Sequence, residues 1–347
     1  MKSIEIKSML VVFSAGLCLG LGDVALAQGQ SDIVAAARKE GSVTWYAQPG
    51  SRQPMKEAIE EWGRRYPEIE LKIVEATGAV SAERVRAERS AGKVTADVVT
   101  VGDTVAYPLA ASKALMPLER AKLPNLANMI PRLAGFGNLE DGYLPTLLYV
   151  YGINVNTRRL SEAEIPHSWS DLANPRYSGK IGFHDFSRPG GANSWMTIGM
   201  EALGQQYFTG LMKQNPRVFS SPQELDAAVV RGERAIAAPS RTRLAKDYAG
   251  APIRFIFPQD GIFIGVIHSG IVNGTTHPNA AYLFLNFLLD PVAQRAIAAV
   301  GDVPVIQGVD SPVDFTTAKF LGEGRMTPAG MVRQKELVEF GKTLMQR

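Results

Sequence analysis

The chain of 347 residues is poor in cysteine, and this limits how its fold can be stabilised. Cys18 is the only cysteine, so no disulfide can form within the chain. About 320 residues follow position 27, and a chain of that length buries a sizeable hydrophobic core without cross-links. The length also predicts about two domains.

Long hydrophobic runs are scarce as well, apart from one near the N-terminus. Residues 9–22 are almost entirely apolar, two lysines precede them, and Ala25-Leu26-Ala27 follows them. This order is typical of a cleavable signal peptide over residues 1–27 that leaves Gln28 as the first mature residue. The run is shorter than the roughly 20 apolar residues of a membrane-spanning helix. We therefore expect a periplasmic protein secreted through this signal.

Two other interpretations of this segment stay open from the sequence. It would act as an uncleaved anchor if no peptidase cut after Ala27. A lipid could also be attached at Cys18, although Leu17 stands where a small residue is expected before a lipid-attachment site.

Charge of one sign is not concentrated anywhere in the chain. The sequence has 37 basic and 34 acidic residues, a net charge of +3. No long basic run is interleaved with aromatic residues, as binding to single-stranded nucleic acid requires. We therefore expect no nucleic-acid partner.

Motifs for catalysis and metal binding are also missing. The sequence has no Gly-x-Ser-x-Gly elbow, no His-Glu-x-x-His pair and no phosphate-binding loop. The four histidines are scattered without metal-ligand spacing, at positions 167, 184, 268 and 277. We therefore predict a protein that is not an enzyme and carries no cofactor.

The apolar periodicity predicts strands that alternate with helices. In the first part, strands are expected at 43–47, 69–74 and 96–101, with helices at 54–66, 81–91 and from about 104. Later strands are expected at 180–184, 235–238, 253–257 and 262–267, with helices at 192–203, 223–231, 279–289 and from about 331. Such alternation favours an α/β fold with parallel strands joined by right-handed crossovers.

Several segments, taken in order, resemble one known family. They are Val43-Thr-Trp-Tyr-Ala47, residues 88–98, Tyr151-Gly-Ile-Asn-Val-Asn-Thr157, residues 168–182 and Pro258-Gln-Asp-Gly261. The order and spacing are similar to those of periplasmic solute-binding proteins of ABC importers, in the ferric-iron-binding-like branch of the type II fold.

The resemblance implies an α/β fold of two lobes, each with a mainly parallel sheet flanked by helices, joined by two hinge crossovers. Lobe 1 is expected at 28–148 plus 258–310, and lobe 2 at 149–257 plus 311–347. A ligand would be captured between the lobes by hinge closure. The expected partners are a small-molecule anionic ligand and the membrane permease of an ABC importer, and the expected state is a monomer.

The chain departs from its iron-binding relatives at the positions that hold the metal. Counted along the matching segment, the tyrosine pair of those relatives falls on Thr242 and Arg243. The histidine position falls near Gly50 and the carboxylate position near Gly102. A ferric ion needs anionic oxygen donors, and a guanidinium has no lone pair to give. We therefore predict no metal site.

The same comparison favours an anion site in the second lobe. Gly190 and Gly191 stand at an expected helix start, where backbone N–H groups carry partial positive charge. Arg188, Arg241 and Arg243 are expected nearby, and together they would bind a carboxylate, phosphate or phosphonate group. Arg243 ranks first because it replaces a metal ligand of the relatives, Arg241 second and Arg188 third.

Ligands of open α/β sheets bind beyond the carboxyl ends of the strands, and this rule supplies the remaining candidates. They are Ala192, Asn193, Ser194, Ser240, Thr242, Tyr46, Gln48, Ser51, Arg52, Thr77, Ser81, Asp103 and Gln259. A residue such as Tyr46 is more often part of the core than a ligand contact. Helix capping explains Thr77 and Ser81 as well as binding does, and an arginine after a strand is usually a solvated surface residue.

Two alternatives to the importer function remain. The closed protein would instead signal to a membrane sensor kinase, or the chain would bind ferric iron through atypical ligands.

The predicted signal peptide gives a first test. Export should remove residues 1–27, so that the mature protein begins at Gln28. The intact mass of protein isolated from the periplasm checks this expectation, and a retained leader or a lipid on Cys18 would contradict it.

Overall fold

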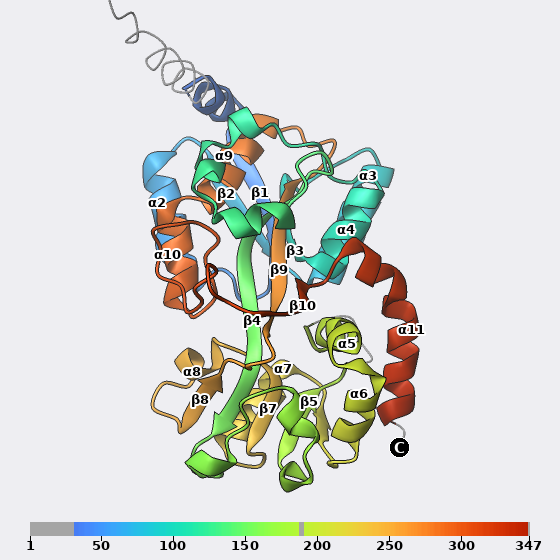
Figure 1. The fold of residues 1–347 in the computed structure, drawn as a ribbon. Coiled ribbons are helices and arrows are strands. Elements are labelled where there is room, and N and C mark those ends of the chain that lie inside the picture. Colours follow the sequence, from blue (N-terminus) through green and yellow to red (C-terminus); the bar gives the residue numbers. More distant parts are fainter. Residues whose placement is uncertain (1–30, 187–190, 346–347) are drawn as a thin grey trace, which may run out of the picture.

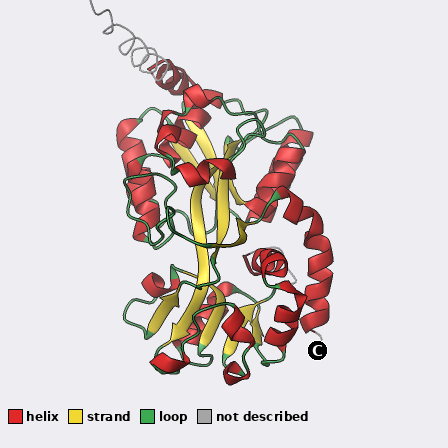
Figure 2. Ribbon diagram, in the orientation of Figure 1, coloured by secondary structure: helices red, strands yellow, loops and turns green. Residues whose placement is uncertain are grey.

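Two halves lie one above the other in the computed structural model, which describes residues 31–186 and 191–345 (Figure 1). The strand β4 (Leu144–Asn156) runs from the upper half into the lower one. Helices lie on the outside of the strands in both halves (Figure 2). The candidate signal peptide and residues 187–190 lie outside the described residues.

All ten labelled strands belong to one mixed sheet. Its order is β2-β1-β3-β9-β4-β7-β5-β6, with β10 beside β9 and β8 beside β4. The other bounds are β1 Ser42–Ala47, β2 Glu70–Glu75, β3 Val98–Gly102, β5 Ile181–His184, β6 Arg217–Phe219, β7 Ile236–Arg241, β8 Ile253–Ile256, β9 Ile262–Ile271 and β10 Phe320–Arg325.

Parallel pairing occurs within each half, and antiparallel pairing joins the halves. The strand β1 is parallel to β2 and β3, and β5 is parallel to β6 and β7. The strand β4 is antiparallel to β9 over 144–151 and to β8 over 153–156. The predicted two-lobe α/β fold with mainly parallel lobes and crossovers between them is therefore confirmed.

The helices cover this sheet and largely follow the predicted pattern. Their bounds are α2 Lys56–Arg65, α3 Gly78–Ser90, α4 Asp103–Ala111, α5 Gly191–Ala202, α6 Gly204–Met212, α7 Pro222–Val230, α8 Leu244–Asp247, α9 Pro278–Leu288, α10 Pro291–Ala299 and α11 Pro328–Met345. Residues 31–40 are also helical. Within the described residues, no helix is both long enough and apolar enough to cross a membrane.

Some boundaries differ from the prediction for local reasons. The helix α3 begins at Gly78 rather than Ser81, because the Thr77 hydroxyl accepts a hydrogen bond from the Val80 N–H at 3.4 Å and caps the helix there. The strands β6 and β10 and the helices α6 and α10 were not predicted, since short or mixed segments carry little periodicity.

Aromatic side chains mark a separate core in each half. In the upper half, Trp62 packs against Phe284 with ring centroids 5.2 Å apart. In the lower half, Trp195 lies 5.4 Å from Trp169 and 5.2 Å from Phe208. The predicted limits of the lobes stay a prediction, and Val313 and Phe315, from a segment given to lobe 2, pack within the upper core.

Gln294 connects three backbone segments in the upper core. It is fully buried, and its Nε2 donates to the carbonyls of Thr146 at 2.8 Å and Leu288 at 2.7 Å. Its Oε1 accepts from the Val305 N–H at 2.7 Å. The amide therefore satisfies backbone groups of β4, α9 and the segment after α10.

Replacing this amide should destabilise the fold. The change Gln294→Met keeps the volume but leaves three buried backbone groups unpaired, so we expect a loss of about 3 kcal/mol or more in the free energy of unfolding. Urea denaturation measures it. Gln206→Met, at an exposed position of α6, is the matched control, and equal stabilities of the two variants would contradict this role.

Candidate ligand-binding cleft

The largest relevant cavity is a cleft of about 900 Å³ between the two halves. Its walls come from the carboxyl ends of β1, β2, β5 and β7, from the middle of β4, and from α7 and α8. The lining residues are Gln48, Pro49, Gly50, Thr77, Tyr149, Tyr151, His184, Pro222, Gln223, Leu225, Asp226, Pro239, Ser240, Arg241, Arg243, Asp247 and Tyr248. The strand ends meet here as they do at ligand sites of other α/β sheets.

Arg241 lies at the centre of the polar side chains in this cleft. It is the last residue of β7 and is the register partner of Tyr151 on β4. Its guanidinium lies over the ring of Tyr149, 4.7 Å from the centroid. Tyr149 and Tyr151 are two positions apart on β4 and therefore share one face of the strand.

The charge of Arg241 is maintained by its neighbours. Burial alone would lower the pKa of Arg241, but the phenols of Tyr151 and Tyr149 and the carboxyls of Asp302 and Asp226 together raise it. Burial in turn raises the pKa of Tyr149. The cleft therefore presents a fixed cation beside two neutral phenols.

Arg243, two residues further on, is already paired. Its Nε lies 3.0 Å from Oδ1 and 3.1 Å from Oδ2 of Asp247, and its Nη1 lies 3.4 Å from Oδ2 of Asp302. Among the described residues, the ion pairs of the cleft involve Arg243 and not Arg241. Of the two arginines that line the cleft, Arg241 is therefore the one that forms no ion pair with a described carboxylate.

Acidic and basic groups around the cleft are shifted towards their neutral forms. Burial raises the pKa of Asp226 to about 6, against the opposing charge of Arg241. Burial also raises the pKa of Asp302 and lowers that of His184 to about 4. Near pH 7 the imidazole of His184 is neutral, whereas Asp226, with a pKa of about 6, is still mostly ionised.

Ser240 is held in place beside Arg241. Its hydroxyl accepts a hydrogen bond from Nδ2 of Asn154 at 2.8 Å and donates one to Oδ1 of Asp226 at 3.2 Å. The serine therefore links β4, β7 and α7 at the lower wall of the cleft.

The predicted helix start of the second lobe is only partly described. Arg188 and Gly190 lie outside the described residues. Gly191 is the first residue of α5, and a Cβ there would lie 2.3 Å from the Tyr151 hydroxyl. Its lack of a side chain therefore serves the contact with β4.

The rest of this helix start is core, which differs from the sequence prediction. Ala192 is fully buried and Ser194 is 3% exposed. Asn193 donates from Nδ2 to the Phe186 carbonyl at 2.9 Å and accepts from Gln334 Nε2 at 2.6 Å. These side chains are used within the lower half, because α5 packs between β10 and α11.

Six of the other predicted residues line the cleft or the cavity at its edge. Gln48, Thr77, Ser240, Arg241 and Arg243 line the cleft itself. Ser51 lines a smaller cavity beside it.

Three predicted residues point into the upper half. The Tyr46 hydroxyl donates to the carboxylate of Glu88. Ser81 is fully buried and Asp103 is 5% exposed. Their positions follow strand ends as expected, but their side chains face the core.

The remaining three lie away from the cleft. The Thr242 hydroxyl donates to the Gly301 carbonyl at 3.0 Å. Arg52 is exposed and donates from Nη2 to the Ile73 carbonyl at 2.9 Å. Gln259 is exposed, and its N–H donates to the His167 carbonyl at 2.8 Å.

The sequence analysis missed several cleft residues. Tyr149, Tyr151, His184 and Asp226 were not proposed as site residues, and neither was Asp302, which lines the smaller cavity beside the cleft. The sequence does contain a signal for the two tyrosines, because they are two positions apart on the hinge strand and therefore share one of its faces. In the part of the chain that the structure describes, no group of three or more His, Cys, Asp or Glu side chains is placed to hold a metal ion.

The chain matches the family model of bacterial extracellular solute-binding proteins over residues 57–321. It therefore belongs to this family, which is one of binding proteins rather than enzymes. An uncharacterized protein of Haemophilus influenzae is 25% identical over 211 residues, which are 56% of this chain and 59% of that protein. The match thus spans less than two thirds of the length of that relative.

Solved structures of the same fold support the predicted resemblance. Iron-bound HitA from Pseudomonas aeruginosa is similar with a TM-score of 0.69 and 20% identity, covering 87% of this chain and 99% of HitA. AfuA from Actinobacillus pleuropneumoniae, with fructose-6-phosphate bound, has a TM-score of 0.68 and 19% identity. The match covers 88% of this chain and 98% of AfuA. A Bordetella ferric binding protein has a TM-score of 0.67 and 14% identity, and the match covers 88% of this chain and 99% of that protein. The resemblance to the ferric-binding-like branch of the type II fold is confirmed.

The buried carboxyl of Asp103, which lies outside the cleft, makes the stability of the fold depend on pH. Its Oδ1 accepts from the Thr104 N–H at 2.7 Å, whereas its Oδ2 has no hydrogen-bond partner among the described residues. Burial raises the pKa of this carboxyl from 3.8 to about 7. The folded state therefore binds a proton that the unfolded state releases near pH 4.

The sign of the pH dependence follows from this raised pKa. The stabilisation from the bound proton is present at low pH and is lost as pH rises from about 4 to about 7. Relative to Asp103→Asn, which does not titrate, the wild type should lose about 2–3 kcal/mol of unfolding free energy between pH 5 and pH 8. Urea denaturation at the two pH values measures the difference. Asp310→Asn, at an exposed carboxyl, is the control, and parallel curves for wild type and Asp103→Asn would contradict the account.

Proposed function

We propose that the chain is an extracytoplasmic solute-binding protein that captures a small anionic organic solute in the cleft and delivers it to an ABC importer. One observation carries the proposal: Arg241 is a largely buried cation that faces the cleft and forms no ion pair with a carboxylate among the described residues. The expected headgroup is a carboxylate, phosphate or phosphonate.

The energetics of Arg241 favour an anionic ligand. A buried charge is costly unless it is paired and hydrogen-bonded. The ring of Tyr149 supplies part of the compensation through a cation–π contact. An anionic headgroup would supply the rest through charge-assisted hydrogen bonds, which a planar guanidinium donates two at a time.

The dimensions of the cleft are consistent with a small organic ligand. Pockets for such ligands have volumes of roughly 300–1,000 Å³, and the cleft has about 900 Å³. The similar AfuA structure holds fructose-6-phosphate. A sugar phosphate or an organic acid of similar size is therefore a reasonable probe for this chain.

A ferric ion is the alternative ligand, because two tyrosines line the cleft. Tyr149 and Tyr151 face the cleft as possible oxygen donors. Burial raises the pKa of both phenols, which opposes formation of the phenolate that the metal needs. The cation of Arg241 beside them opposes a trivalent ion as well, so we place the anion first.

The family and the predicted signal peptide support a position outside the cytoplasm. Solute-binding proteins of this kind hand their ligand to a membrane permease, and we propose the same here. A sensor-kinase output remains the alternative. Genes for a permease and an ATPase beside this one would support the importer, and genes for a kinase and a response regulator would support the sensor.

The two arginines of the cleft give the decisive comparison. Calorimetry with inorganic phosphate, fructose-6-phosphate, citrate and phosphonoacetate should find at least one anion that binds. Arg241→Gln should weaken that binding about 30- to 1000-fold, because the headgroup loses its charged partner in a desolvated site. Arg243→Gln should weaken it less than about tenfold, because Asp247 and Asp302 already compensate Arg243. This order reverses the ranking from the sequence.

Arg295→Gln, at an exposed position of α10, is the matched control and should bind as the wild type does. A visible charge-transfer band with stoichiometric uptake of ferric citrate would favour the iron alternative. Unchanged anion affinity in Arg241→Gln would contradict the proposed site.

A further inference from the structure

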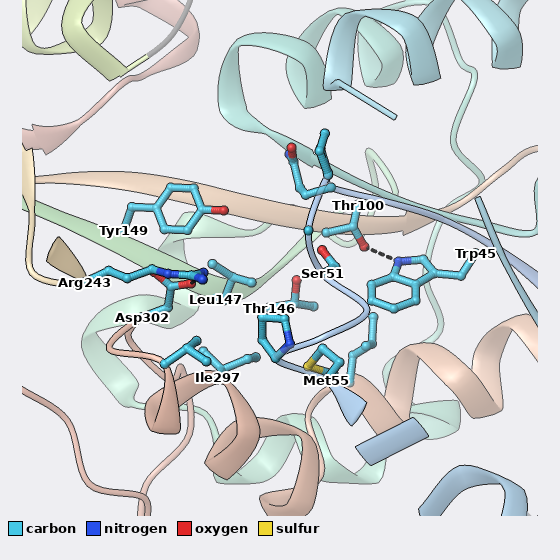
Figure 3. Close-up of a pocket in the computed structure, with 16 residues that line it drawn as sticks. Trp45, Ser51, Met55, Thr100, Thr146, Leu147, Tyr149, Arg243, Ile297 and Asp302 are labelled. Atoms are coloured by element: carbon cyan, nitrogen blue, oxygen red, sulfur yellow. Dashed lines mark hydrogen bonds and ion pairs between the residues drawn. The ribbon is translucent and has the colours of Figure 1, made fainter. Parts of the chain in front are cut away.

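A second and smaller cavity lies beside the cleft in the upper half. It has a volume of about 60 Å³. Gln48, Pro49, Gly50, Tyr149 and Arg243 line both spaces, so the cavity meets the cleft at this edge. Figure 3 shows Arg243, Asp302 and Tyr149 together on one side of the cavity, with Trp45 and Met55 on the other.

Most of the wall of this cavity is apolar. Its apolar side chains come from β1, β4, the helices α9 and α10 with the residue after α10, and the residue before α2. They include Trp45, Met55, Leu147, Leu288, Ile297 and Val300. On β4, Thr146 and Leu148 are buried, whereas Leu147 between them is only half-buried. Leu147 lines this cavity, so its exposed part is an apolar surface on the face of the sheet that borders the cavity.

The polar groups at the floor of the cavity bind one another. Trp45 Nε1 donates to Thr100 Oγ1 at 2.8 Å (Figure 3). The Thr100 hydroxyl lies 2.7 Å from Ser269 Oγ, which lies 2.8 Å from Thr146 Oγ1. These groups therefore offer little to a bound water, which needs two to four polar partners to be held.

We infer that this cavity is a subsite for a short aliphatic part of the ligand, an inference that rests on the proposed anion-binding function. An apolar cavity of about 150 Å³ takes up benzene, so about 60 Å³ accommodates roughly two to four carbon atoms. The solute class is an organic anion that carries a short alkyl chain or branch.

Tyr149 connects the two parts of this site. Its ring lies under the guanidinium of Arg241, and it also lines the small cavity. A ligand whose headgroup reaches Arg241 therefore passes Tyr149 and places its chain against Leu147 and Ile297. The ion pair of Arg243 with Asp302 stands at the edge between the polar and apolar parts.

Two series of probes test the inference directly. They are the straight-chain alkylphosphonates from methyl to hexyl and the carboxylates from acetate to heptanoate, measured by calorimetry. Each carbon that enters the cavity should improve affinity about fourfold, the effect of burying one methylene group. The gain should stop after about two to four carbons, when the cavity is full.

Variants of Leu147 locate the chain in this cavity. Leu147→Phe fills the space and should end the gain at a shorter chain, and Leu147→Ala should extend it to a longer one. Arg241→Gln should lower the affinity of every member by a similar factor. Arg295→Gln, at an exposed position of α10 outside both spaces, is the control and should leave the dependence on chain length as it is.

The outcomes separate this inference from the proposed function. If an anion binds through Arg241 but the affinity does not change with chain length, or the Leu147 variants do not move the optimum, the subsite is wrong and the anion site stands. If neither these series nor the phosphate, sugar-phosphate and citrate probes bind, the anion site is wrong and the subsite falls with it.

Discussion

The antiparallel pairing of β4 with β9 is the constraint on which the rest of this structure depends. It pairs Leu148 with Val266 in the upper half and Tyr151 with Phe263 at the border of the lower half. The rings of Tyr151 and Phe263 stack with centroids 4.8 Å apart. Because one strand is shared by both halves, side chains in its middle face the space between them.

This shared strand explains how polar side chains of both halves come to lie in the cleft. The strand β7 pairs with the lower part of β4 and brings Arg241 beside Tyr149 and Tyr151. Their rings and the surrounding backbone reduce the contact of the guanidinium with water. The burial of Asp226 and Asp302 raises the pKa of these two carboxyls, and the charge of Arg241 opposes that rise. A charge kept in such surroundings interacts with a ligand more strongly than one in water.

Much of the fold could be predicted from the sequence, because the apolar periodicity is strong in β1, α2, β5 and α7. The extent of β4 was not predicted, since its thirteen residues contain a change of pairing partner that no periodicity records. The ends of the strands were predicted well enough to identify Gln48, Thr77 and Arg241, which line the cleft.

The directions of side chains were the part that spacing could not supply. Ser81 and Asp103 follow strand ends as ligand-binding residues do, but helix starts turn them into the core. Arg243 ranked first by its place in the chain, yet Asp247 lies one helical turn further on and pairs with it. Asp226 and Asp302 are far from Arg241 in sequence, so only the fold brings them into its surroundings.

The most direct test of the central claim is the chemical identity of what the protein carries from its own cells. Protein purified from the native periplasm is denatured, and the small molecules released from it are identified by mass spectrometry and metal analysis. The account predicts an anionic organic molecule at close to one per protein, absent from the Arg241→Gln variant. A ferric ion, or a neutral or cationic solute carried equally by both proteins, would contradict it.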